Sequence, residues 1–103
     1  MPDNIMTLPF PQIEDLCRRY QVRELAVFGW FVRDDFGDHS DLDLLVEFAD
    51  EAEIGFLELA ALARELSEVT NHRVDLVPKN GLKPSIREQV LNSARILYVA
   101  KSV

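Results

Sequence analysis

Residues 24–48 read ELAVFGWFVRDDFGDHSDLDLLVEF, two short apolar runs separated by a polar segment. The first run, 24–29, ends in glycine, which predicts a buried strand followed by a tight turn, with room for one helical turn after it. The second run, 41–48, predicts another strand. Side chains alternate along a strand, so the even-numbered apolar residues of 41–48 face a core. Asp41 and Asp43 then stand together on the opposite face.

Two helices are predicted from apolar residues that recur at three- and four-residue steps. Segment 12–20 shows this spacing, with prolines just before it that suit a first helical turn. A longer helix is predicted over 50–71, where acidic residues crowd the first turn. Its expected core stripe consists of Phe56, Leu59, Leu62, Leu66 and Val69.

The C-terminal part of the chain predicts a third strand, a last helix and one further extended segment. The strand covers 72–78, the helix covers 82–94, and 95–100 is an edge strand or an extended tail. Core candidates in the last helix are Ile86, Val90 and Leu91. Strands that alternate with helices predict an α/β (α+β) fold, a small mixed sheet flanked by helices. A length of 103 residues fits one domain, 1–103.

Composition excludes several classes of protein. The formal charge of −7 and a pI of about 4.7 argue against direct nucleic-acid binding over an extended surface. Carboxylates concentrate between residues 34 and 58. The N-terminus does not resemble a signal peptide, and no run approaches the roughly 20 apolar residues of a membrane span. The single cysteine, Cys17, suits a reducing compartment. We expect a soluble, cytoplasmic protein with no membrane partner.

The acidic pair is the strongest candidate for chemistry. Two carboxylates about 4 Å apart repel by roughly 1 to 4 kcal/mol, so their proximity calls for a function. Asp75 lies within 72–78 and joins Asp41 and Asp43 if that strand pairs beside 41–48. Three such carboxylates suit Mg²⁺, which keeps coordination positions for substrate phosphates. The structural alternative is that Asp41 caps a turn, Asp43 is solvated and Asp75 pairs with an arginine.

Gly29 supplies a second candidate element. It directly follows the first predicted strand, where free backbone N–H groups can cradle phosphate oxygens. One glycine after a strand is a weak signal alone. The Asp-x-Asp pair that follows Gly29 after a short interval makes a phosphate-binding role more specific.

Residues 27–48 resemble the nucleotidyltransferase signature, in which Gly-Ser is followed after a short interval by Asp-x-Asp. Within the DNA polymerase beta-like nucleotidyltransferase superfamily, the chain is most similar to the minimal nucleotidyltransferases, small proteins encoded beside HEPN-domain toxins. Segment 72–99, HRVDLVPKNGLKPSIREQVLNSARILYV, is also similar to the ending of that subgroup. The resemblance implies a polymerase beta-like fold and the antitoxin of a type VII-like HEPN/minimal nucleotidyltransferase pair.

The same resemblance implies an activity and a partner. Such antitoxins are understood to be Mg²⁺-dependent protein adenylyltransferases that move AMP from ATP to a tyrosine of the HEPN ribonuclease toxin, which silences it. A hetero-oligomer with a toxin dimer is expected. Asp41 and Asp43 would bind the metal ions, and Asp75 would be the third carboxylate, which helps to deprotonate the accepting hydroxyl.

The nucleotide-binding residues follow from the same match. Gly29 would shape the phosphate-binding turn, and Ser40 corresponds to the serine that commonly precedes the first aspartate. Arg33 aligns with the arginine of the family's Arg-Gly pair and is expected to contact phosphate. A surface ion pair with Asp34 or Asp35 is the alternative for Arg33.

Two positions depart from the family pattern. Trp30 stands where the family has serine beside the triphosphate, and Asp34 stands where it has glycine. An indole brings a large apolar body and a single N–H donor in place of a small hydroxyl. Asp34 adds negative charge near the expected position of a polyanionic nucleotide. Both changes predict weaker use of ATP, although Trp30 keeps its place in the predicted nucleotide site.

Two other functions stay open. In the first, the chain is a catalytically weak or inactive antitoxin that neutralises the toxin by binding it. In the second, it transfers a nucleotidyl group to a small molecule such as an antibiotic. The shortness of the chain speaks against the second.

Overall fold

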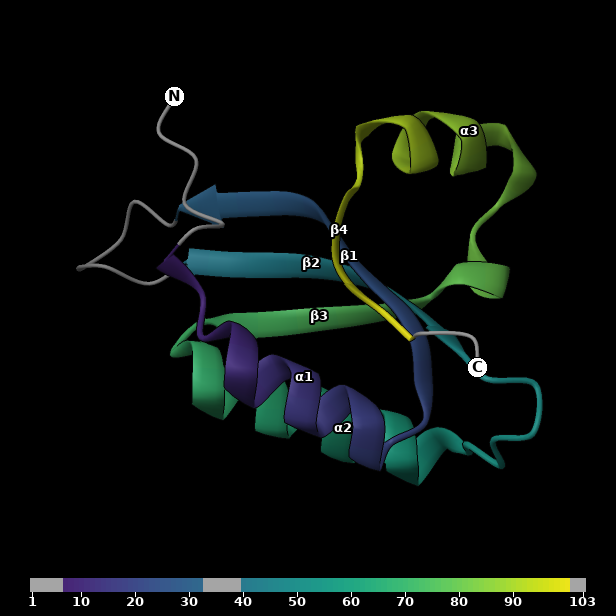
Figure 1. Cartoon of the computed structure of the whole chain (residues 1–103). Coiled ribbons are helices and arrows are strands. Elements are labelled where there is room, and N and C mark those ends of the chain that lie inside the picture. Colours follow the sequence, from purple (N-terminus) through teal and green to yellow (C-terminus); the bar gives the residue numbers. More distant parts are fainter. Residues whose placement is uncertain (1–6, 33–39, 101–103) are drawn as a thin grey trace.

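The computed structural model describes residues 7–32 and 40–100, which form an open sheet flanked by helices (Figure 1). The elements, in chain order, are α1 (Phe10–Arg19), β1 (Val22–Val32), β2 (Ser40–Phe48), α2 (Phe56–Thr70), β3 (Arg73–Pro78), the 3₁₀ turn η2 (Lys79–Gly81), α3 (Pro84–Ser93) and β4 (Arg95–Val99). The four strands lie in the order β3-β2-β1-β4. Only the β2–β3 pair is parallel among these neighbours. The predicted mixed sheet flanked by helices is confirmed.

The hydrophobic core lies between the sheet and the two helices α1 and α2, which run side by side in Figure 1. Its strand residues are the ones expected from alternation along β2, since Leu42, Leu44 and Val46 are all buried. Leu62 and Leu66 of α2 are completely buried against them. The crossover from β2 through α2 to β3 therefore fixes the parallel pair that carries the three aspartates.

The start of α2 differs from the prediction. The helix begins at Phe56 rather than near residue 50, because Gly55 precedes it in an extended conformation. The Gly55 backbone N–H donates to the Glu58 carboxylate at 2.7 Å, which satisfies a donor that the helix cannot satisfy itself. The predicted core stripe is consequently wrong at its first member. Phe56 occupies the first helical position, beyond the edge of the core, and is 82% exposed.

The path of β1 also differs from the prediction. No tight turn follows Gly29, since β1 continues to Val32 and pairs with β2 along its whole length. The aromatic and β-branched residues after Gly29 favour a pleated strand, and this preference outweighs the turn signal of the glycine. The register shifts between Val27 and Gly29, which leaves Phe28 as an extra residue in β1. Gly29 thus marks a β-bulge within a strand.

The C-terminal segment supplies the last strand of the sheet, at the edge next to β1. Segment 95–100 forms a true edge strand, β4, antiparallel to β1, and so is not a tail. In α3, Val90 is half-buried and Leu91 is exposed, while the side chain of Ile86 lies outside the described residues. In the described ranges, none of the helices has the length and apolar character needed to cross a membrane.

Candidate functional site

Asp41, Asp43 and Asp75 occupy neighbouring positions on the two parallel strands. In the β2–β3 register, Asp43 lies opposite Asp75 and Asp41 lies opposite Arg73. Residues opposite one another in adjacent strands point to the same face, and so do residues two apart in one strand. All of these side chains therefore stand on the face away from α1 and α2. The predicted pairing of 72–78 beside 41–48 is present in the structure.

The three aspartates line a common cleft with two residues of β3, Arg73 and Val74. The cleft has a volume of about 430 Å³ and is open to solvent. Asp41 and Asp43 are half-buried within it, whereas Asp75 is exposed. The cleft thus offers two inner carboxylates and one at its rim, where an incoming substrate can reach it.

Electrostatics single out Asp43. Its burial, then the charge of Asp75, and then the charge of Asp41 raise the pKa of the Asp43 carboxyl above its ordinary value. Each cause makes the ionised form of Asp43 less favourable in the folded chain. A divalent cation or a proton would relieve the repulsion. Asp43 is therefore the carboxylate that gains most from a positive ligand in this cleft.

The cleft offers a small set of oxygen donors for the Mg²⁺ that the sequence predicts. Within 7–32 and 40–100, no group of three or more His, Cys, Asp or Glu side chains is arranged to hold a single metal ion. Mg²⁺ in phosphate-handling sites is commonly held by one or two carboxylates, with water and substrate phosphates completing its shell. The half-buried Asp41–Asp43 pair fits that smaller set. Metal binding by Asp75 stays a prediction.

Arg73 is a site residue that sequence reasoning missed. It lines the cleft and lies opposite Asp41 in the register, so it brings a cation to a group of three carboxylates. The Arg-x-Asp spacing of Arg73 and Asp75 was the available signal, because residues two apart in a strand share a face. Its positive charge at the cleft is suited to contact with a phosphate or with a ligating carboxylate.

The predicted nucleotide-binding residues are described only in part. Gly29 lies opposite Asp43 across the β1–β2 pair, so the backbone of Gly29 and the side chain positions of Asp43 and Asp75 form one row across three strands. Trp30 and Ser40 are described for their backbone alone, which pairs with Leu42 and Val32 respectively.

Arg33 and the rest of segment 33–39 lie outside the described residues. The predicted contact of Arg33 with phosphate therefore stays a prediction, as do the roles of the side chains of Trp30 and Ser40.

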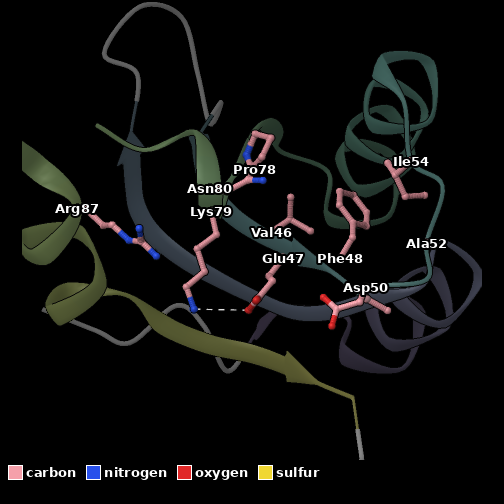
Figure 2. Close-up of a pocket in the computed structure, with 11 residues that line it drawn as sticks. Val46, Glu47, Phe48, Asp50, Ala52, Ile54, Pro78, Lys79, Asn80 and Arg87 are labelled. Carbon is pink, nitrogen blue, oxygen red and sulfur yellow. Dashed lines mark ion pairs between the residues drawn. The ribbon is translucent and has the colours of Figure 1, made fainter. Parts of the chain in front are cut away.

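A second hollow lies at the other end of β2 and has a different character (Figure 2). It has a volume of about 360 Å³ and is bordered by β2, the β2–α2 loop, η2 and α3. Lys79 reaches Glu47 at 3.5 Å and Glu24 at 3.8 Å between nitrogen and oxygen, as the dashed line of Figure 2 marks for the first pair. Arg23 also lies 3.9 Å from Glu47. The carboxylates at this end of the sheet thus have cationic neighbours of their own.

Comparison with known proteins agrees with this geometry. Residues 12–97 match the family model of the nucleotidyltransferase domain. The protein adenylyltransferase MntA of Thermococcus cleftensis is 37% identical over 86 residues, which cover 84% of this chain and 83% of that protein. A provisionally assigned protein adenylyltransferase of Methanocaldococcus jannaschii is 33% identical over 76 residues, covering 74% of this chain and 80% of the relative.

Solved structures show the same fold. One assigned provisionally as a minimal nucleotidyltransferase is 37% identical, with a TM-score of 0.65, and the match covers 84% of this chain and 86% of that one. A crystal structure of a toxin-antitoxin with AMP-PNP gives a TM-score of 0.68 at 23% identity over 91% of this chain and 76% of that one. At 23% identity, the similarity to the toxin-antitoxin structure shows a shared fold and no more.

Proposed function

This chain belongs to the nucleotidyltransferase domain family, and on that premise we propose that it is a protein adenylyltransferase that acts as the antitoxin of a HEPN ribonuclease. It would transfer AMP from ATP to a tyrosine of that partner. The observation that carries the proposal is the cleft in which Asp41, Asp43 and Asp75 meet, in a chain 37% identical to a protein adenylyltransferase. The solved structure of a toxin-antitoxin with AMP-PNP, which shares the fold, is in line with an adenine nucleotide as substrate and a toxin as partner.

Asp41 and Asp43 are the residues we assign to Mg²⁺ in this mechanism. When bound, the ion neutralises charge on the triphosphate and polarises the phosphoryl group that is transferred. The raised pKa of Asp43 supports this assignment, since a carboxylate strained by its neighbours gains most from a cation. Arg73, which lines the same cleft, supplies a fixed positive charge for a phosphate oxygen.

The chemical step follows from the position of Asp75 at the rim. The tyrosine oxygen attacks the α-phosphorus of ATP and forms the new P–O bond. The bond from that phosphorus to the oxygen bridging to the β-phosphorus breaks, and pyrophosphate leaves. Asp75 is exposed, so it can reach the phenol and accept its proton. The Gly29 backbone, in the same row as Asp43, lets a phosphate approach closely because no side chain intervenes.

A second function, neutralisation by binding alone, is favoured by two observations. β1 runs as a paired strand through Gly29 and Trp30 to Val32, where the predicted phosphate cradle required a turn. Trp30 also replaces the serine expected beside the triphosphate. A chain that has lost efficient nucleotide use can still hold its partner through the same fold. This second function predicts that the chain protects cells from the toxin without transferring AMP to it.

Mass spectrometry of the partner tests the enzymatic proposal. The chain is incubated with the HEPN partner, ATP and Mg²⁺, and the intact mass of the partner is measured before and after. We expect mass increases in whole AMP units that require both ATP and Mg²⁺. An unchanged partner mass under conditions in which the complex forms would refute AMP transfer.

The Asp43→Asn variant separates the two functions. The enzymatic proposal predicts that this variant still forms the complex but neither modifies the partner nor protects cells that express it. Full protection of cells by Asp43→Asn, with no modified partner, would favour the binding antitoxin. Asp15→Asn, an exposed change on α1, is the matched control and should protect as the unchanged chain does.

A further inference from the structure

The loop before α2 and the first turn of that helix form an exposed surface that nucleotidyl transfer does not use. Phe56 and Leu57 are 82% and 77% exposed and adjacent in the chain. Scattered single apolar residues are normal on protein surfaces, whereas contiguous ones mark contact sites. The N-terminal position of this pair in α2 keeps both side chains clear of the core that buries Leu62 and Leu66. The pair therefore forms an apolar protrusion.

Carboxylates surround the protrusion. Segment 50–58 contains no Lys or Arg, and its acidic residues are Asp50, Glu51, Glu53 and Glu58, all on exposed positions. Asp50 lies 3.8 Å from Arg23, and Glu58 caps the backbone of Gly55. The segment as a whole still carries excess negative charge. We call segment 50–58 the acidic-apolar patch.

The hollow of Figure 2 continues this patch toward the sheet. Ile54 and Phe48 border it on the side of the loop, and Arg87 of α3 lies across from them (Figure 2). An apolar protrusion next to a hollow is the shape that two proteins fit reciprocally, with an anchor from each side filling a recess in the other. The patch and the hollow together thus have the form of a docking surface.

We propose that the acidic-apolar patch docks a basic face of the HEPN partner, with Phe56 and Leu57 as its apolar anchors. This inference rests on the proposed function for the identity of the partner. The negative charge of the patch favours a cationic partner over a second copy of this chain. A ribonuclease must attract polyanionic RNA and so presents cationic surface. A second copy of this chain, whose formal charge is −7, would set acidic surface against acidic surface, which opposes association.

Docking at this patch leaves the aspartate cleft accessible. Asp43 lies near the start of β2, whereas the patch follows the end of that strand. Phe48 lies five residue steps along the strand from Asp43, roughly 16 Å at the rise of an extended chain. A partner held by the patch can present a tyrosine to the cleft from its own surface. Binding and chemistry therefore depend on different residues and can be impaired separately.

The test measures the dissociation constant between the full chain and the HEPN partner. Three proteins are compared: the unchanged chain, the double variant Phe56→Ser with Leu57→Ser, and the control Ile96→Ser on β4, which removes an equally apolar side chain that is 60% exposed. We expect binding to weaken by about 30-fold or more for the double variant, as for hot-spot anchors, and by less than about threefold for the control. Thermal unfolding of each variant should give a Tm close to that of the unchanged chain, because the replaced side chains are already largely exposed to water.

A charge variant tests the second half of the proposal. Glu51→Lys with Glu53→Lys should weaken binding, and added salt should weaken binding of the unchanged chain more than binding of this variant. Equal binding by the Phe56/Leu57 double variant and the unchanged chain would overturn the patch while leaving AMP transfer to the partner intact. Failure of the unchanged chain to bind the partner would overturn both proposals. Self-association of the unchanged chain that the double variant abolishes would assign the patch to a second copy and also overturn the inference.

Discussion

Replacing Asp43 with asparagine should make the fold more stable and the enzyme inactive. The amide has nearly the shape of the carboxylate but no charge, so it removes both the cost of burying a charge and the repulsion with Asp75 and with Asp41, which together raise the pKa of Asp43. It also removes one of the two carboxylates assigned to the cation. A gain in stability together with a loss of activity is the signature of a residue kept for function.

The size of the gain follows from the geometry of the cleft. Asp75 lies opposite Asp43 in the adjacent strand and Asp41 lies two residues away on the same face. Side chains in these positions are separated by about 5 to 7 Å, where two charges screened largely by water repel by roughly 0.5 to 1 kcal/mol. Removing two such repulsions should increase the free energy of unfolding by about 1 to 2 kcal/mol. For a chain of this length, that raises Tm by about 5 to 10 °C.

The gain should depend on pH in a defined direction. A raised pKa means that the folded chain holds the Asp43 proton above the pH at which the unfolded chain releases it, so stability of the unchanged chain falls as pH rises through that window. Below about pH 3 the carboxyl is largely protonated in both states and the penalty disappears. The advantage of Asp43→Asn should therefore be full near pH 7 and vanish in acid.

Urea unfolding of both proteins from pH 3 to pH 8, on the order of one pH unit apart, measures this difference. The control is Asp15→Asn, whose exposed carboxylate pairs with Arg19 within α1. Its effect should stay below about 0.5 kcal/mol. Destabilisation by Asp43→Asn at pH 7, or a gain that persists unchanged at pH 3, would refute the reasoning.

Four further predictions concern the core and the nucleotide. The thiol of Cys17 is buried and its pKa is raised to about 12, so a thiol reagent such as Ellman's should react only after unfolding; rapid reaction with the folded chain would contradict this. Leu62→Ala removes a fully buried side chain and should cost about 3 to 5 kcal/mol of unfolding free energy in a denaturant titration, and a loss below 1 kcal/mol would show a looser core. Trp30→Ser should increase the rate of AMP transfer about tenfold or more, measured with the partner and Mg-ATP. An unchanged rate would show that Trp30 does not limit AMP transfer. Mg-ATP at about a hundredfold excess over its dissociation constant should stabilise the Trp30→Ser chain by roughly 2.7 kcal/mol, seen as a higher Tm, whereas an unchanged Tm would show that the folded variant does not bind the nucleotide.

The sequence predicted the sheet and the meeting of the aspartates because both depend on alternation. In β2, every second residue is apolar and the others include Asp41 and Asp43, so one face must be the core and the other the cleft. Asp75 could be placed beside them since a helix between two strands favours a parallel pair. That step needed only the order of the elements.

The errors arose where local signals compete with tertiary context. Gly29 reads as a turn in isolation, but pairing with β2 makes it a bulge inside a longer strand. Phe56 fits the apolar spacing of α2, but spacing does not show where the sheet ends, so its exposure could not be foreseen. Arg73 could not be assigned from sequence, because an arginine in a strand is typical of a solvent-exposed side chain and only the register places it opposite Asp41.

The rate of AMP transfer to the HEPN partner by four single variants tests the central claim most directly. Asp41→Asn, Asp43→Asn and Asp75→Asn each alter one carboxylate of the cleft, while Asp15→Asn alters an exposed one on α1. If the cleft is the active site, each of the first three should lower the rate by about a hundredfold or more, and Asp15→Asn should leave it unchanged. Transfer at the unchanged rate by any of the three cleft variants would contradict the assignment of that carboxylate to the chemistry.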